Sequence, residues 1–361
     1  MNRILFILHV PPPVHGASMV GKYIKESEII NNTFRCKYIN LSMARSIDDV
    51  GRFSLYKIVS YIKLIFSIIC KVFIFRPNLV YVTPNAAGKV FFKDFIIVQL
   101  LKLLKQKVIV HYHNKGVKNA SKIKIYDRCY RIFFKNVKVI LLANALYKDI
   151  SGYVRCKDVF ICPNGIPETD YTHIVRNSDK FQLLFLSNMI KTKGVFTLLE
   201  ACEILKDKIE FECNFIGGWG DIDAEKFTKE VENKNLSSFV KFYGALYGKS
   251  KDNFFKSSDI FIFPTYYPNE CFPLVLLEAM QHGLPCISTN EGGITDIIDN
   301  NTGIIIEKEN PQALADAIFH LYKNTEMRKK MGYNGLEKFK REFTLEIFEK
   351  RIIDIFNKCL S

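Results

Sequence analysis

Short apolar runs and longer stretches with helical spacing alternate along the whole chain. In the first half, the apolar runs predict strands at 4–10, 79–83, 107–113, 137–142 and 159–162. A polar stretch near 168–180 interrupts the pattern, which then predicts strands at 182–187, 213–217, 240–243, 259–263, 286–289 and 303–306. This strand and helix alternation predicts an α/β fold of two tandem Rossmann-like, doubly wound domains, with ligands bound in the cleft between them.

Length and composition agree with two folded domains. The chain has 361 residues, whereas single cores rarely grow beyond roughly 250 to 300 residues. We expect an N-terminal domain at 1–170, a second domain at 171–342, and a final helix at 343–361 that returns to the first domain. The apolar run at 4–10 is short and is followed by three prolines, which favours a first strand over a secretion signal. The ten cysteines include no CxxC pair and are interpreted as reduced residues of a cytosolic protein.

The net charge of +14 is unevenly distributed. Residues 1–180 contain 29 Lys and Arg and 11 Asp and Glu, a net charge of +18, whereas residues 181–361 contain 22 and 26, a net charge of −4. Such segregation is typical of proteins that bind a polyanion, either nucleic acid or an acidic membrane surface.

Two lysine-containing apolar segments, 52–77 and 91–107, favour the membrane. No uncharged run in them reaches the roughly 18 to 20 residues of a transmembrane helix, so we expect basic amphipathic helices that lie on anionic lipid. The alternative is a pair of ordinary surface helices packed on a sheet, with their lysines extended into water. The lysines expected to face lipid are Lys57, Lys63, Lys71, Lys102 and Lys105.

Several loops after predicted strands carry candidate ligand-binding residues. Gly16, in "PPPVHGAS", allows close approach of the backbone to an anion at the start of a helix. His113 ends a strand, although His111 shares its face and either residue is compatible with a core position. Lys193 precedes a helix, where a cation is favoured only if it binds an anion such as phosphate. Gly217 lies in "FIGGWGD", which lacks both the dinucleotide-binding spacing and the lysine of a P-loop.

The stretch "NECFPLVLLEAM" at 269–280 places Glu270 before a predicted helix and Glu278 within it. Pro273 is suited to the first turn, where free backbone N–H groups point towards a bound diphosphate. Glu278 follows about 7.5 Å further along the helix, so the two carboxylates suit the two ends of a nucleotide sugar. The alternative is a pair of surface glutamates. The N–H groups assigned to the diphosphate are those around Phe272, Leu274 and Val275.

The region 240–306 closely resembles the signature region of the family 4 (group 1) retaining glycosyltransferases of GT-B fold. The strand, the helix with E-x7-E, "GLP" and "GG" occur there in the same order, and "ICPNGIP", "MIKTKGV" and "PPPVHGAS" resemble other family segments. The resemblance implies that Glu270 contacts the donor sugar, Glu278 the ribose and Lys193 the diphosphate. It also implies that His113 lies near the reacting carbon of the donor sugar.

Two positions depart from this family pattern. Asn188 stands where many members have an arginine that assists the lysine, and Asp296 replaces the more usual glutamate after "GG". Asn188 is therefore kept among the expected donor-binding residues, while its capacity to replace the arginine is open.

The resemblance implies a retaining transfer from a nucleoside diphosphate sugar, and we expect the nucleotide to be UDP rather than GDP. We expect a lipid-linked or oligosaccharide acceptor of bacterial surface polysaccharide synthesis, and a protein attached peripherally to the inner face of the cytoplasmic membrane. No cofactor or metal is expected, because Lys193, the backbone at Gly16 and the helix near Pro273 supply positive groups for the diphosphate. "DID" at 221–223 resembles a metal-binding DxD motif but belongs to a loop of another fold class.

Two other classes of function remain open. A nucleotide-sugar 2-epimerase of GT-B fold would use the same diphosphate site without an acceptor. A nucleic-acid-binding module would explain the positive charge, but the sequence contains no recognised motif for it.

Overall fold

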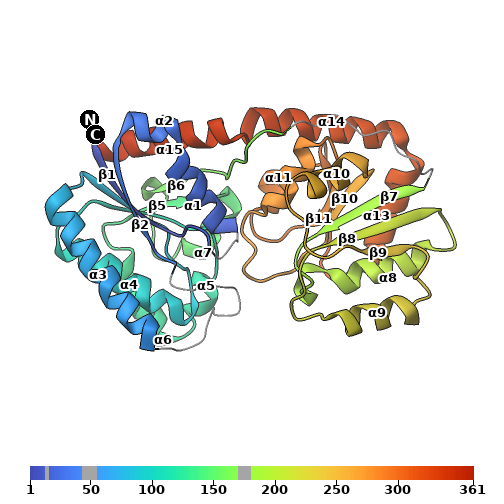
Figure 1. Ribbon diagram of the computed structural model, residues 1–361, viewed down its shortest axis with the longest axis horizontal. Helices are drawn as coiled ribbons and strands as arrows, with labels where there is room; N and C mark the ends of the chain where they lie inside the picture. Colours follow the sequence, from blue (N-terminus) through green and yellow to red (C-terminus); the bar gives the residue numbers. More distant parts are fainter. Residues whose placement is uncertain (13–15, 43–54, 170–179) are drawn as a thin grey trace. The chain divides into compact units, whose positions relative to one another are not determined.

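The computed structural model describes residues 1–12, 16–42, 55–169 and 180–361. The chain forms two compact units, the first made of Met1–Gly165 and Leu345–Ser361, the second of Ile166–Thr344. Each unit contains one six-stranded parallel sheet with helices on its faces (Figure 1). This confirms the prediction of two Rossmann-like α/β domains. The expected boundaries at 170/171 and 342/343 lie within a few residues of the divisions between the units.

The first sheet has the strand order β2-β1-β3-β4-β5-β6. Its central strands are apolar and buried along most of their length, as expected for a parallel sheet covered on both faces. Strand β2 lies outside the strands expected from the apolar runs, because this edge strand, "RCKYIN", alternates exposed and partly buried residues and contains no apolar run. The strands are β1 (Arg3–Leu8), β2 (Arg35–Asn40), β3 (Leu79–Val82), β4 (Val108–His111), β5 (Lys138–Leu141) and β6 (Val159–Ile161).

Figure 1 shows α3, α4 and α6 on one face of the first sheet and α2 with α15 along the other. On the second face, the ring of Phe356 in α15 lies 5.7 Å from the ring of Phe6 and 5.6 Å from that of Tyr81. The last helix therefore completes the core of the first unit. The helices are α1 (Gly16–Glu26), α2 (Glu28–Thr33), α3 (Leu55–Phe75), α4 (Gly88–Leu103), α5 (Val117–Ala120), α6 (Lys124–Phe133), α7 (Tyr147–Ile150) and α15 (Leu345–Leu360).

Helix α3 is unusually apolar. By length and composition alone, its segment Ile58–Phe75 could cross a membrane, with a mean hydropathy of 2.2 and 22% of the segment buried within the protein. The expectation that no segment is long enough to cross a membrane considered only runs without charged residues. The segment Ile58–Phe75 contains Lys63 and Lys71 and was therefore not counted. A buried stripe, formed by Leu64, Ile68, Val72 and Phe75, packs α3 into the first unit.

The second sheet has the order β12-β11-β10-β7-β8-β9. The chain continues from β7 to β8 on one side and later adds β10 on the other, so the strand order reverses between β7 and β10. In open α/β sheets, loops at the carboxyl ends of such neighbouring strands form the ligand site. The strands are β7 (Phe181–Leu186), β8 (Phe211–Ile216), β9 (Val240–Phe242), β10 (Ile260–Phe263), β11 (Cys286–Thr289) and β12 (Gly303–Ile306).

Helices α8 and α9 lie on one face of this sheet and α10 and α11 on the other, with α14 beside α11 (Figure 1). The helices are α8 (Val195–Leu205), α9 (Ala224–Asn233), α10 (Lys249–Ser257), α11 (Leu274–Gln281), α12 (Ile294–Ile297), α13 (Pro311–Lys323) and α14 (Thr325–Glu342).

Candidate functional site

Two of the predicted residues meet where the strand order of the second sheet reverses. The Nζ atom of Lys193, from the loop after β7, lies 2.5 Å from Oε2 of Glu270, from the loop after β10. Only 16% of the lysine side chain and 10% of the glutamate side chain are exposed. The ammonium group also lies 4.6 Å from the ring centre of Tyr267, a cation–π distance. The pair therefore forms a shielded, polar centre at the expected end of the sheet.

The backbone around Lys193 is fixed by neighbouring loops. Lys193 ends a short 3₁₀ helix, and Gly194 follows with φ +86°, a left-handed conformation that L side chains rarely adopt. A Cβ atom on Gly194 would lie 2.3 Å from the carbonyl oxygen of Pro264. The carbonyl of Thr192 also accepts a 2.8 Å hydrogen bond from the N–H of Tyr266. These contacts join the loop after β7 to the loop after β10 and position the lysine.

The two glycines after β11 contact the backbone at Glu270 and at the residue that follows it. A Cβ atom on Gly292 would lie 2.3 Å from the carbonyl oxygen of Glu270, and the N–H of Gly293 donates to the carbonyl of Cys271 at 2.7 Å. The Oγ1 atom of Thr265 lies 3.5 Å from the Glu270 carboxylate. The "GG" motif therefore has a packing role, because it allows the loop after β11 to contact the backbone at Glu270.

Helix α11 begins at Leu274, and Pro273 is its N-cap without a side-chain hydrogen bond. N–H groups in the first turn of a helix have no acceptor within that helix, and the N-terminus has a partial positive charge. The N–H groups of Leu274 and Val275 are therefore candidate donors to an anion. Phe272 is buried with its ring 5.9 Å from that of Phe343, so its side chain belongs to the core.

Glu278, the fifth residue of α11, forms a second lysine–glutamate pair. Its Oε1 atom lies 2.8 Å from Nζ of Lys251 in α10, and 21% of each side chain is exposed. Burial raises the pKa of Glu278 above its usual value, although Lys251 opposes the change. Lys251 was not among the expected site residues, because only the packing of α10 beside α11 brings this lysine to the glutamate.

The structure gives Gly217 a packing role and leaves Asn188 on the surface. Gly217 has φ +154°, and a Cβ atom there would lie 1.7 Å from the carbonyl oxygen of Ser187, so the glycine lets the loops after β7 and β8 touch. Asn188 is exposed beside Gly218.

The two aspartates of "DID" accept hydrogen bonds from nearby backbone N–H groups. Asp221 accepts the N–H of Lys191 at 2.7 Å, and Asp223 caps α9 by accepting the N–H of Lys226 at 2.8 Å. Within the described residues, no group of three or more His, Cys, Asp or Glu side chains is arranged to hold a metal ion.

His113 and Gly16, the other two candidates, belong to the first unit. His113 lies two residues beyond β4, with its ring 4.2 Å from that of His111. His111 is buried and shares a 2.8 Å hydrogen bond with the hydroxyl of Tyr81. Its pKa is lowered mainly by burial and to a smaller extent by the charge of His113. His111 is thus the core histidine, while His113 is partly exposed. Gly16 begins α1 with open space around its Cα atom.

Two of the lysines expected to face lipid are bound to backbone carbonyls instead. Lys71 donates to the carbonyl of Tyr38 at 3.0 Å. Lys102 donates at 2.6 Å to the carbonyl of Phe133 at the end of α6, and burial, with a smaller effect of Lys135, lowers its pKa to about 8. These hydrogen bonds hold both ammonium groups against the protein, and the docking of this face on lipid stays a prediction. Lys63 and Lys105 are exposed, and the side chain of Lys57 lies outside the described part of the chain.

Part of the chain is similar to known glycosyltransferases. Residues 168–338 match the family model of the glycosyl transferases group 1. The chain is 25% identical over 262 residues to the O-antigen chain mannosyltransferase C of Escherichia coli. The matched region covers 71% of this chain and 70% of that protein. It is 24% identical to the amylovoran biosynthesis glycosyltransferase AmsK of Erwinia amylovora, covering 72% of this chain and 65% of that protein.

A solved structure has the same fold over the whole chain. The Anabaena protein Alr3699/HepE, determined in complex with UDP, superposes with a TM-score of 0.75 over 99% of this chain and 100% of that one, at 14% identity. The fold is therefore the GT-B fold of two Rossmann-like units, and the family match over residues 168–338 and the relatives support a transferase. The subdivision into family 4 remains an expectation from the sequence.

Proposed function

We propose that this protein is a retaining glycosyltransferase that moves a sugar from a nucleoside diphosphate sugar to a lipid-linked glycan. The contact between Lys193 and Glu270 carries the proposal, because it joins a cation for the diphosphate to a carboxylate for the sugar. This contact lies at the strand-order reversal of the second sheet, where Rossmann-like domains bind nucleotides.

The chemistry follows from the charge that develops on the leaving diphosphate. Lys193 and the N–H groups of Leu274 and Val275 would stabilise that charge as the sugar–phosphate bond breaks. Glu270 would accept hydrogen bonds from sugar hydroxyls, and Glu278 from the ribose. A same-face attack without a protein nucleophile would retain the anomeric configuration. The role that the family resemblance gives to His113 stays a prediction.

The donor and acceptor are proposed from the relatives. A UDP donor is supported by the UDP complex of the structurally similar Anabaena protein. An acceptor of bacterial surface polysaccharide synthesis is supported by the relatives named for O-antigen and amylovoran.

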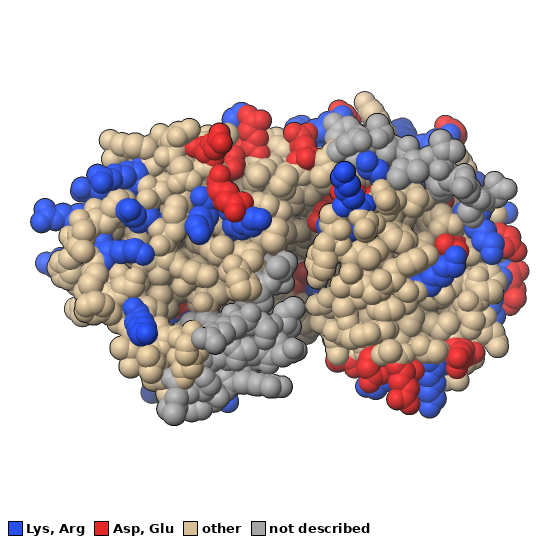
Figure 2. All heavy atoms as spheres, viewed as in Figure 1, with Lys and Arg blue, Asp and Glu red and all other residues tan. Residues whose placement is uncertain are grey.

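Peripheral attachment to the cytoplasmic membrane face is supported by the first unit. Large apolar side chains are exposed along three helices on one face of its sheet, and Figure 2 shows basic side chains set within a largely uncharged surface. Apolar insertion combined with attraction of basic groups to anionic lipid is typical of peripheral attachment. The exposed residues are Val59, Ile62, Phe66 and Phe73 on α3, Val90, Ile96 and Leu103 on α4, and Ile125 and Ile132 on α6.

Calorimetric titration with UDP and GDP tests the donor site. We expect UDP to bind more tightly than GDP, and the substitution Lys193→Gln to weaken UDP binding by about tenfold or more through loss of a charge-assisted contact. Lys206→Gln, a lysine of the same unit that donates to the carbonyl of Lys234, is the matched control. Equal UDP binding by the parent and Lys193→Gln would contradict the proposed site.

A further inference from the structure

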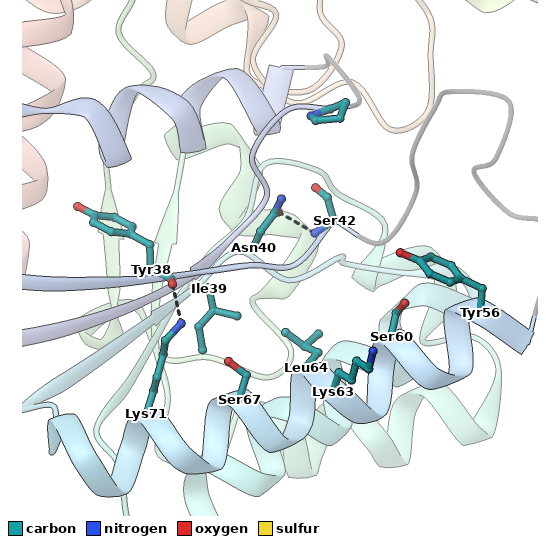
Figure 3. Close-up of a pocket in the computed structure, with 11 residues that line it drawn as sticks. Tyr38, Ile39, Asn40, Ser42, Tyr56, Ser60, Lys63, Leu64, Ser67 and Lys71 are labelled. Carbon is teal, nitrogen blue, oxygen red and sulfur yellow. Dashed lines mark hydrogen bonds between the residues drawn. The ribbon is translucent and has the colours of Figure 1, made fainter.

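A cavity of the first unit lies between the carboxyl end of β2 and helix α3 (Figure 3). Its volume is about 510 Å³, within the range of small-molecule sites. Among the described residues that line it, none is acidic, while hydroxyl, amide and ammonium groups are abundant. The polar lining is provided by Asn40 and Ser42 on one side and by Ser60, Lys63, Ser67 and Lys71 on the other.

The four α3 residues form one polar stripe, because they are spaced three or four positions apart and project from the same side of the helix towards β2 (Figure 3). The ammonium group of Lys71 is held at the strand end by the carbonyl of Tyr38. Burial, together with the nearby charge of Lys37, lowers the pKa of Lys71. An anion in the cavity would favour the charged form of this lysine and accept hydrogen bonds from the hydroxyl groups beside it.

The cavity adjoins the end of the first sheet where ligands are expected. Oδ1 of Asn40 accepts hydrogen bonds from the N–H of Val10 at 3.1 Å and of Ser42 at 2.9 Å, and the Ser42 hydroxyl donates to the carbonyl of Val10 at 3.2 Å. These bonds connect the rim of the cavity to the loop after β1, at the carboxyl ends of the strands.

A different stripe of α3 is apolar and exposed. Val59, Ile62, Phe66 and Phe73 are 50%, 62%, 68% and 63% exposed, and at 100° per residue they lie on the side away from the buried Leu64 and Ile68. One helix thus presents a cation-containing polar cavity and, separately, an apolar surface. This combination matches a ligand with a phosphate head and a hydrocarbon chain.

We propose that the cavity between β2 and α3 binds the phosphate or diphosphate group and adjoining sugar of a lipid-linked acceptor, whose hydrocarbon chain lies along the apolar stripe of α3. The volume exceeds what a phosphate alone requires and leaves room for a sugar. This inference rests on the proposed glycosyltransferase function and assigns the acceptor site within it.

Crossed binding measurements test the assignment. Geranyl diphosphate, a soluble isoprenoid diphosphate, and UDP are each titrated into the parent protein, into the double variant Lys63→Gln with Lys71→Gln, and into Lys193→Gln. We expect the double variant to lose about tenfold or more in affinity for geranyl diphosphate while keeping its affinity for UDP. Lys193→Gln should lose affinity for UDP while keeping its affinity for geranyl diphosphate. Lys148→Gln, an exposed lysine of the first unit, is the matched control, and thermal unfolding verifies that each variant is folded.

The outcomes separate this inference from the proposed function. If neither UDP nor GDP binds the parent, the proposed function fails, whereas nucleotide binding without any effect of the double variant on geranyl diphosphate overturns the acceptor site alone. Inorganic diphosphate binding as tightly as geranyl diphosphate would show a simple anion site and overturn the lipid assignment. Loss of binding to phosphatidylglycerol vesicles with unchanged geranyl diphosphate binding would assign the cavity to membrane headgroups instead.

Discussion

At the scale of single residues, the second unit contains two partly buried lysine–glutamate pairs with different proposed tasks. Lys193 and Glu270 would divide the diphosphate and the sugar between them, while Lys251 neutralises Glu278. In both pairs, replacing the carboxylate with an amide frees the lysine but leaves only a weaker, uncharged acceptor for hydroxyl groups. Substitutions of the two glutamates should therefore have different effects on nucleotide affinity, turnover and stability.

Glu270→Gln should preserve or tighten UDP binding, because Lys193 no longer interacts with a carboxylate and is available to the diphosphate. Turnover should fall by about 100-fold, since hydrogen bonds to the donor sugar weaken in the transition state. Calorimetry with UDP and single-turnover transfer assays measure the two effects. Glu203→Gln, which breaks a surface pair with Lys234, is the control and should change neither. A parallel loss of UDP affinity and rate would count against this division of roles.

Glu278→Gln should raise the melting temperature at neutral pH but not at acidic pH. The pKa of Glu278 is raised by burial, so its charged form costs stability above that pKa. Below the ordinary glutamate pKa, both the folded and unfolded states are protonated and the cost disappears. Thermal unfolding between about pH 4 and pH 8 measures the difference. UDP affinity should fall in the same variant, and a lower melting temperature at neutral pH would show that the pair with Lys251 dominates instead.

At the scale of elements, the loops of the second unit hold the site through glycines that allow backbone contacts. Gly194, Gly217 and Gly292 each occupy a position where a Cβ atom would come within 2.3 Å of a carbonyl oxygen. Real Cβ atoms do not approach oxygens this closely, so these loops depend on glycine at all three positions.

Gly194→Ala should destabilise the protein by about 2 kcal/mol or more, because the left-handed backbone and the contact with Pro264 both oppose a side chain. Displacement of the backbone at residue 194 should also move Lys193 and weaken UDP binding. Gly152→Ala is the matched control, since a Cβ atom there has no neighbour within 4 Å. Chemical denaturation measures both variants, and equal stability would mean that the loop rearranges without strain.

Sequence patterns predicted the elements that have a continuous buried apolar run and missed those defined by tertiary packing. Strands such as β4 and β10 were found, whereas β2 escaped because an edge strand needs no apolar run. Motif and spacing singled out Glu270 and Lys193, which the structure places in contact, and the start of α11 near Pro273, while the roles of these residues stay predictions. Lys251 and the cavity were missed. The serines that line the cavity share one face of α3 by their spacing, but the sequence alone does not show that this face lies opposite β2.

At the scale of the whole molecule, the exposed apolar residues of the first unit are better candidates for membrane attachment than its lysines. Lys71 and Lys102 interact with carbonyl groups of the protein, whereas Ile62, Phe66 and Phe73 are more than half exposed. The apolar stripe should therefore determine attachment, with the charge of the first unit adding attraction to anionic lipid.

Replacing Ile62, Phe66 and Phe73 with serine should release the protein from phosphatidylglycerol vesicles, because each buried apolar side chain contributes about 1.5 to 3 kcal/mol. Co-sedimentation across a salt series measures attachment. The control replaces Tyr247 and Tyr333, which are exposed in the second unit, with serine and should leave pelleting unchanged. If the triple variant pelleted as much as the parent, the apolar stripe of α3 would not be the surface that attaches the protein to the membrane.

The return of α15 to the first unit affects how the nascent chain folds. The second unit is inserted between Gly165 and Leu345 of the first, and the N–H of Ile166 donates to the carbonyl of Phe343 at 3.0 Å, so its two ends lie side by side. During translation, the second unit emerges from the ribosome complete, while the first still lacks the helix whose Phe356 packs against Phe6. A ribosome that terminates just after Thr344 would thus release a chain in which an unfinished first unit is followed by a finished second unit.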